Sequence, residues 1–81
     1  MKIIEYNGTR NIAGDRIREA RLKQRISQAQ LAARVQVEGV ILEQDVISRI
    51  ESGQRILLDY ELKALAKCLG VPVSWLLNET D

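Results

Sequence analysis

Signals for the starts and ends of helices divide this chain into short segments, and they constrain the fold more than any other feature. Ser27 precedes an amphipathic stretch and has Gln30 three residues later, which is the pattern of a capping box at a helix start. Gly53 and Gly70 each follow an amphipathic stretch, where a helix commonly ends in a left-handed residue. A chain of 81 residues divided in this way predicts a bundle of short helices.

Apolar residues recur at helical spacing in five stretches. We expect helices over residues 11–24, from Ser27 to about residue 36, over residues 44–52, from just after Asp59 to Gly70, and over a short turn after Pro72. Asn11 or Thr9 can cap the first helix, and Asp59 can cap the fourth. The predicted core comes from the apolar stripes: Ala13, Ile17, Ala20, Leu31, Ala32, Val35, Val46 or Ile47, Ile50, Leu62, Leu65, Ala66, Leu69, Trp75, Leu76 and Leu77. The fold class is therefore all-α, with five helices in one domain at residues 11–81.

Residues 1–10 form an N-terminal arm ahead of this domain. Asn7-Gly8 is a turn signal, and residues 2–6 could form a short strand. A lone strand has nothing in this chain to pair with, so the arm either packs on the helices or pairs with a second copy.

Charge is distributed unevenly along the chain. From Arg10 to Arg34 there are seven basic and two acidic residues, whereas Val35 to Asp81 has four basic and eight acidic ones. A small protein with one basic region can bind a polyanion on the surface that this region forms. A solvated helix face is the alternative explanation of the same pattern.

Composition argues against catalysis, metal binding and a membrane location. The chain has no histidine and one cysteine, Cys68, so a Cys–His nucleophile and a disulfide within the chain are excluded and a metal site is implausible. We interpret Cys68 as a small core residue. No glycine-rich phosphate loop, signal peptide or apolar run long enough for a bilayer is present. We therefore expect no enzyme activity, no cofactor, no membrane partner and a cytoplasmic location.

Five segments of the sequence, in order, resemble the phage-repressor and Cro type of helix-turn-helix regulators, also called the XRE family. They are Arg21, Ser27-Gln28 with Leu31-Ala32, Ile47-Ser48-Arg49-Ile50-Glu51-Ser52-Gly53, Leu65-Ala66-Lys67-Cys68-Leu69-Gly70-Val71, and Val73-Ser74-Trp75-Leu76-Leu77. The resemblance implies a lambda-repressor-like fold. The connection ahead of the third helix departs from the family by about five extra residues, around 38–42. Because exposing Val40, Ile41 and Leu42 would forfeit burial, we expect this connection to pack on the core or contact a partner.

The resemblance also implies sequence-specific binding of double-stranded DNA by a transcriptional regulator, with repression as the expected action. Domains of this size usually read paired half-sites as homodimers. Base reading is expected from the exposed side of the third helix, where Gln44 can pair with adenine and Arg49 with guanine. Two further residues share that side, Asp45 and Ser48. No small-molecule ligand is expected.

Other residues are expected to contact DNA phosphates or to stabilise the packing of the helices. Gln28, at the start of the second helix, and Gln54 and Arg55, just past the third, are predicted phosphate contacts. The resemblance implies a buried ion pair between Arg21 and Glu51. A different class of function is a protein-interaction module of antitoxin or anti-repressor type that keeps the fold without reading DNA. The acidic second half and the altered connection are the features that favour it.

Overall fold

Five helices make up the architecture of the computed structural model, which describes residues 5–79. They are α1 (Gly14–Lys23), α2 (Gln28–Val37), α3 (Gln44–Glu51), α4 (Asp59–Leu69) and α5 (Val73–Leu76). Within residues 5–79 no strand is formed beyond one isolated bridge, between Tyr6 and Thr9. The prediction of an all-α, five-helix fold is confirmed.

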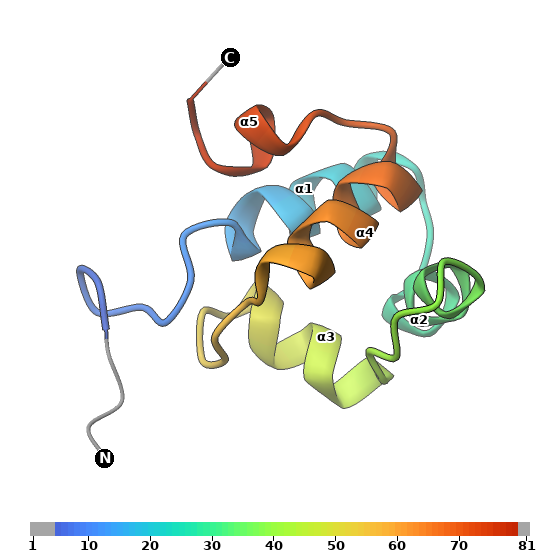
Figure 1. Ribbon diagram of the computed structural model, residues 1–81, viewed down its shortest axis with the longest axis horizontal. Helices are drawn as coiled ribbons and strands as arrows, with labels where there is room; N and C mark the ends of the chain where they lie inside the picture. The colour runs from blue at the N-terminus through green and yellow to red at the C-terminus, as the bar shows by residue number, and fades with distance from the viewer. Residues whose placement is uncertain (1–4, 80–81) are drawn as a thin grey trace.

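The helices pack around α1 and α4, which lie side by side through the middle of the molecule (Figure 1). Helix α3 packs against α1 and α2, and α5 closes the opposite side against α1 and α4. Every helix contributes to one buried core, whose largest fully buried side chains are Ile17, Leu31, Val35, Leu42, Ile47, Ile50, Leu65 and Leu76. The core thus supports α3 from one side and leaves its other side at the surface.

The local signals for helix ends give the observed boundaries. The hydroxyl of Ser27 accepts from the Gln30 N–H at 3.0 Å, and the Gln30 side chain accepts from the Ser27 N–H at 2.7 Å, so the capping box is complete. Gly53 follows α3 with a φ of 78°, and Gly70 ends α4 with a φ of 68°. Both glycines adopt the left-handed conformation that terminates a helix, as the sequence predicts.

Two helix starts differ from the prediction. Helix α1 begins at Gly14 rather than residue 11, because the Asn11 side chain caps the turn and accepts from the Ala13 and Gly14 N–H groups. The predicted cap at Asp59 is wrong. Asp59 is already the first residue of α4, where its carboxylate accepts the Tyr60 N–H at 2.7 Å, while Glu61 accepts the Leu58 N–H at 3.0 Å.

The long connection between α2 and α3 packs on the core only in part. Leu42 is 2% exposed and belongs to the core, and Val40 packs against the core half-buried. Ile41 is 66% exposed, so it does not pack on the core, and its contact with a partner stays a prediction. At the start of the connection, Glu38 pairs with Lys67 on α4 at 2.6 Å. The connection is therefore anchored at both ends, with Ile41 at the surface between them.

The remaining predictions concern the termini and two half-buried side chains. Asn7 and Gly8 form the predicted turn, while residues 2–4 of the possible strand lie outside the described residues. Cys68 is half-buried rather than fully buried, and this burial raises the pKa of its thiol. Trp75 is also half-buried, with the Arg16 guanidinium 4.6 Å from its ring centroid. Neither side chain belongs to the fully buried core.

Candidate nucleic-acid interface

The four predicted base-reading residues lie together on the surface of α3. Gln44 and Ser48 are one turn apart, as are Asp45 and Arg49, and all four side chains are exposed. Ile47 and Ile50 point into the core from the opposite side of the same helix. Because residues four apart share one side of a helix, the sequence pattern alone forces this division. Helix α3 therefore presents donors and acceptors to the solvent from a single surface.

Asp45 and Arg49 form an ion pair on this surface. The Arg49 Nη2 lies 3.5 Å from the Asp45 Oδ2, and both side chains are more than half exposed. An exposed pair of this spacing stabilises a helix by only about 0.3–0.5 kcal/mol. Arg49 is therefore held loosely and can exchange the carboxylate for a stronger partner.

Gln28 lies beside the polar surface of α3, at the first position of α2. It lines a shallow depression together with Glu43, Gln44, Asp45 and Ser48. Its side chain is half-buried and donates from Nε2 to Glu51 Oε1 at 3.1 Å. The start of α2, where backbone N–H groups lack helical partners, therefore flanks the polar surface of α3.

Arg21 and Glu51 form a buried ion pair between α1 and the end of α3. Arg21 Nε and Nη2 donate to the two oxygens of Glu51 at 2.7 and 2.9 Å, and Arg21 Nη1 donates to the Ile26 carbonyl at 2.9 Å. The residues are only 8% and 4% exposed. The hydrogen bond to Glu51 raises the pKa of Arg21. Arg21 thus fixes the end of α3 to α1 and to the start of α2. Because its guanidinium is buried, it does not add positive charge to the protein surface.

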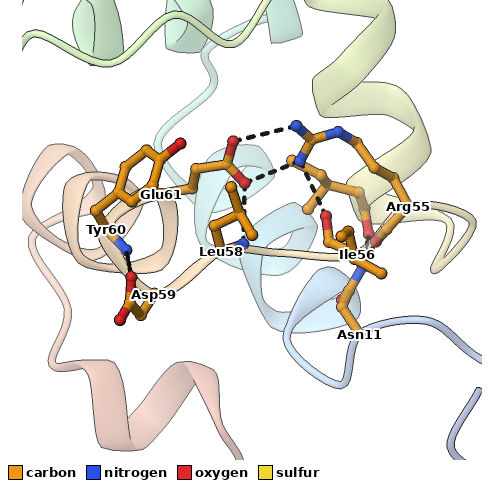
Figure 2. Close-up of polar contacts among 8 residues, drawn as sticks. Asn11, Arg55, Ile56, Leu58, Asp59, Tyr60 and Glu61 are labelled. Atoms are coloured by element: carbon orange, nitrogen blue, oxygen red, sulfur yellow. Dashed lines mark hydrogen bonds and ion pairs between the residues drawn. The ribbon is translucent and has the colours of Figure 1, made fainter. Parts of the chain in front are cut away.

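Gln54 and Arg55, the other predicted phosphate contacts, differ from each other in their surroundings. Gln54 is exposed, and its N–H donates to the Arg49 carbonyl at 2.8 Å. Arg55 donates to both oxygens of Glu61 at 2.9 and 3.1 Å, and also to the Ile56 carbonyl (Figure 2). The hydrogen bond to Glu61 raises the pKa of Arg55. Because a buried carboxylate occupies its guanidinium, Arg55 holds the chain after α3 against α4.

Asn11 ties together three parts of the scaffold. Its Nδ2 donates to the carbonyls of Ile50 and Arg55 at 2.9 and 2.8 Å, while its Oδ1 accepts at the start of α1. Gly14, in the first turn of α1, lies so close to the Ile50 and Glu51 carbonyls that a β-carbon there would collide with them. The sequence shows only a helix cap at Asn11, because its long-range partners are backbone groups.

Within residues 5–79, no group of histidine, cysteine or acidic side chains could hold a metal ion, and no helix has the length and apolarity to span a membrane. A depression at the amino end of α3 is lined mostly by apolar side chains, including Ile41 and Leu42, whereas the two beside its polar surface are shallow and lined mainly by polar and charged residues. Such a surface suits contact with a large polar partner rather than enclosure of a small ligand.

Comparison with known proteins identifies a family and a similar solved structure. Residues 17–76 match the family model described as helix-turn-helix. Among solved structures, the chain is similar to the P22 c2 repressor protein in its complex with the synthetic operator 9T in the presence of Tl⁺. The two share 33% sequence identity and a TM-score of 0.72 over 86% of this chain and 98% of the repressor chain. No curated protein matches the chain.

Proposed function

The chain belongs to the helix-turn-helix family of XRE type, and we propose that it is a transcriptional regulator that binds double-stranded DNA sequence-specifically. One observation carries the proposal. Helix α3 presents Gln44, Asp45, Ser48 and Arg49 outward, while Arg21 and Glu51 hold its end in the scaffold. The similar repressor is bound to an operator in its own structure, which supports the same use of the fold here.

In this proposal α3 enters the major groove and its polar side chains read base edges. The Gln44 amide donates to adenine N7 and accepts from the adenine N6 amine, and the Arg49 guanidinium donates to guanine O6 and N7. Arg49 releases Asp45 on binding, which costs little because the pair is exposed. Asp45 is then available to accept from a cytosine amine, and Ser48 to bond either kind of base edge.

Phosphate contacts are proposed for Gln28 and Gln54. Gln28 stands at the start of α2, next to the surface of α3, and Gln54 is exposed directly after α3. Arg55 is left out of this set, because Glu61 already engages its guanidinium in a bidentate pair. Its proposed role is to position the chain that carries Gln54.

The finer properties of the regulator follow from this mode of binding. We propose a homodimer on paired half-sites, repression by occupancy of the operator, and a cytoplasmic location. The segment from Val73 to Leu77 is a poor candidate for the contact between two copies, since Leu76 is buried and Val73 and Trp75 pack against the core. Ile41 in the connection remains an exposed candidate. DNA binding without catalysis is the proposed activity.

Selection of duplexes from a random pool at moderate salt tests the proposal. We expect an enriched site, with affinity that falls steeply as salt is raised. Arg49→Ala should cost about 1–3 kcal/mol and relax one base position, because a base-edge contact is lost. Gln28→Ala should instead weaken all sequences alike, which makes it the matched control for a phosphate contact.

An opposite result would favour the protein-interaction module. If no site is enriched and binding to duplex DNA shows no dependence on salt, the polar surface of α3 does not read DNA. Loss of base preference at one position in Arg49→Ala, with the melting temperature unchanged, separates a reading defect from a folding defect.

A further inference from the structure

The N-terminal arm forms a tight hairpin ahead of α1. The Tyr6 N–H donates to the Thr9 carbonyl at 2.7 Å, and the Thr9 N–H donates to the Tyr6 carbonyl at 3.1 Å. Asn7 and Gly8 between them have φ values of 51° and 82°, the left-handed pair typical of a two-residue hairpin turn. In Figure 1 this hairpin projects from the body of the molecule on the side where α3 ends.

The base of the hairpin is docked on the chain that follows α3. The Arg10 N–H donates to the Gly53 carbonyl at 2.8 Å, and Arg10 Nη1 donates to the Gln54 carbonyl at 3.0 Å. The Thr9 hydroxyl donates to the Asn11 carbonyl at 2.6 Å and lies 3.2 Å from the Gly53 carbonyl. Any side chain at Gly53 would collide with Thr9. Arg10 is therefore fixed in place beside the end of α3.

This position makes Arg10 part of the same surface as two proposed DNA contacts. A shallow depression is lined by Arg10 together with Arg49, Ser52 and Gln54. The Arg10 side chain is 35% exposed, so its guanidinium reaches the solvent there. Phosphates of a duplex held by Arg49 and Gln54 would pass along this depression.

Glu5 is the charged partner of Arg10 in the hairpin. Its Oε2 lies 3.7 Å from Arg10 Nε, and its own side chain is about half exposed. A pair at this distance in solvent is weak. A phosphate group forms shorter, charge-assisted hydrogen bonds with a guanidinium and can displace the carboxylate.

We propose that Arg10 binds a phosphate of the DNA backbone, and that Glu5 occupies the guanidinium when no DNA is bound. The inference rests on the proposed function, and it adds a phosphate contact from outside the helix-turn-helix. The hairpin then holds a basic side chain at the end of α3, where α3 itself has only Arg49.

The test measures the affinity of the full chain for a mixed-sequence 24-base-pair duplex over a range of salt concentrations. Arg10→Gln should lower the slope of log K against log salt by about 0.9, the loss of one phosphate contact. Arg10→Lys should restore most of the slope, because the positive charge is kept. Glu5→Gln should raise the affinity about two- to fivefold, and should have no such effect in the Arg10→Gln background.

Arg34→Gln is the matched control, because Arg34 contacts Gln24 at the end of α1 and lies outside the depression. It should leave the slope unchanged. An equal loss of slope in Arg34→Gln and Arg10→Gln would overturn the proposal, because the slope would then depend on the net positive charge of the protein and not on the position of Arg10. An unchanged slope in Arg10→Gln, with Gln28→Ala still impaired, would overturn it while leaving the DNA-binding function standing. If the unaltered chain shows no salt-dependent binding to the duplex, both the Arg10 proposal and the proposed DNA-binding function are overturned.

Discussion

The two ends of α3 are attached to the molecule in different ways. At the carboxyl end, Arg21 pairs with Glu51, Asn11 donates to the Ile50 carbonyl, and Gln54 donates back to Arg49. At the amino end, the side chain of Glu43 makes no capping hydrogen bond. The connection there supplies one fully buried side chain, Leu42.

This difference divides α3 into an end held by directional bonds and an end held by apolar packing. Hydrogen bonds and ion pairs fix both position and rotation, whereas packing of one leucine fixes position more than rotation. Arg49 lies near the first end and Gln44 at the second. We infer that the base reading proposed for Arg49 is set by the shared scaffold, while that proposed for Gln44 depends on the connection.

The largest effect is expected from Arg21→Ala. Removing the guanidinium leaves the Glu51 carboxylate buried and unpaired, which should lower the free energy of unfolding by about 3–5 kcal/mol. Chemical denaturation measures the loss. Arg18→Ala, an exposed position on α1, is the control and should change stability by no more than about 0.5 kcal/mol. A melting temperature unchanged by Arg21→Ala would contradict a scaffold role for the pair.

A comparable but smaller loss is expected at the other end from Leu42→Ala. The truncation removes a fully buried side chain and should cost about 2–5 kcal/mol, depending on how far the connection collapses into the space. Ile41→Ala is the neighbouring control and should cost little, because Ile41 is largely exposed. If the two variants unfold at the same denaturant concentration, Leu42 does not anchor α3.

The chain that follows α3 should also respond to acid, through the pair between Arg55 and Glu61. Burial would raise the pKa of Glu61, but the hydrogen bonds from Arg55 and the Leu58 N–H lower it below its ordinary value of 4.5. Its contribution to stability is therefore complete above that value, and is lost as the pH falls through the lower pKa of the folded state. Glu61→Gln should cost about 1.5–3 kcal/mol at pH 7 and less in acid.

Unfolding curves between pH 7 and pH 3 measure this dependence. The difference between the unaltered chain and Glu61→Gln should shrink as the pH falls below about 4.5. Glu19→Gln, on the exposed surface of α1, should follow the unaltered chain throughout. A difference that stays constant with pH would mean that Glu61 acts through its shape rather than its charge.

The features predicted from the sequence were those that depend on neighbouring residues. The capping box at Ser27 and the left-handed glycines at positions 53 and 70 involve partners within a few residues, so the pattern contains all that is needed. The polar surface of α3 likewise follows from helical spacing. The Arg21–Glu51 pair was expected only through the family resemblance, because its partners are 30 residues apart.

What the sequence did not predict depends on how distant segments meet. Asp59 and Glu61 are both acidic residues at the start of α4, and Glu61 is the one that pairs with Arg55, which comes from the chain after α3. The same contact engages the guanidinium of Arg55, whose phosphate contact stays a prediction. Asn11 reaches backbone carbonyls 39 and 44 residues away, and carbonyls carry no sequence signal.

The smallest predicted effect concerns the missing cap at the amino end of α3. Glu43 has the extended backbone of a helix cap, so Glu43→Ser can place a hydroxyl on the N–H of Val46 without rearranging the chain. Glu43→Ala removes the same charge and supplies no acceptor. We therefore expect Glu43→Ser to be more stable than Glu43→Ala by about 0.5–1 kcal/mol, measured by chemical denaturation.

A cap at this position would also test the division of α3 into two unlike ends. If the amino end is the less firmly held one, a serine there should sharpen base preference at the position read by Gln44 and leave the position read by Arg49 unchanged. Comparing selected sites for the serine and alanine variants measures this directly, since both lack the Glu43 charge. Equal sharpening at both positions would mean that α3 responds as a rigid unit, and that Leu42 already fixes its amino end as firmly as Arg21 fixes the other.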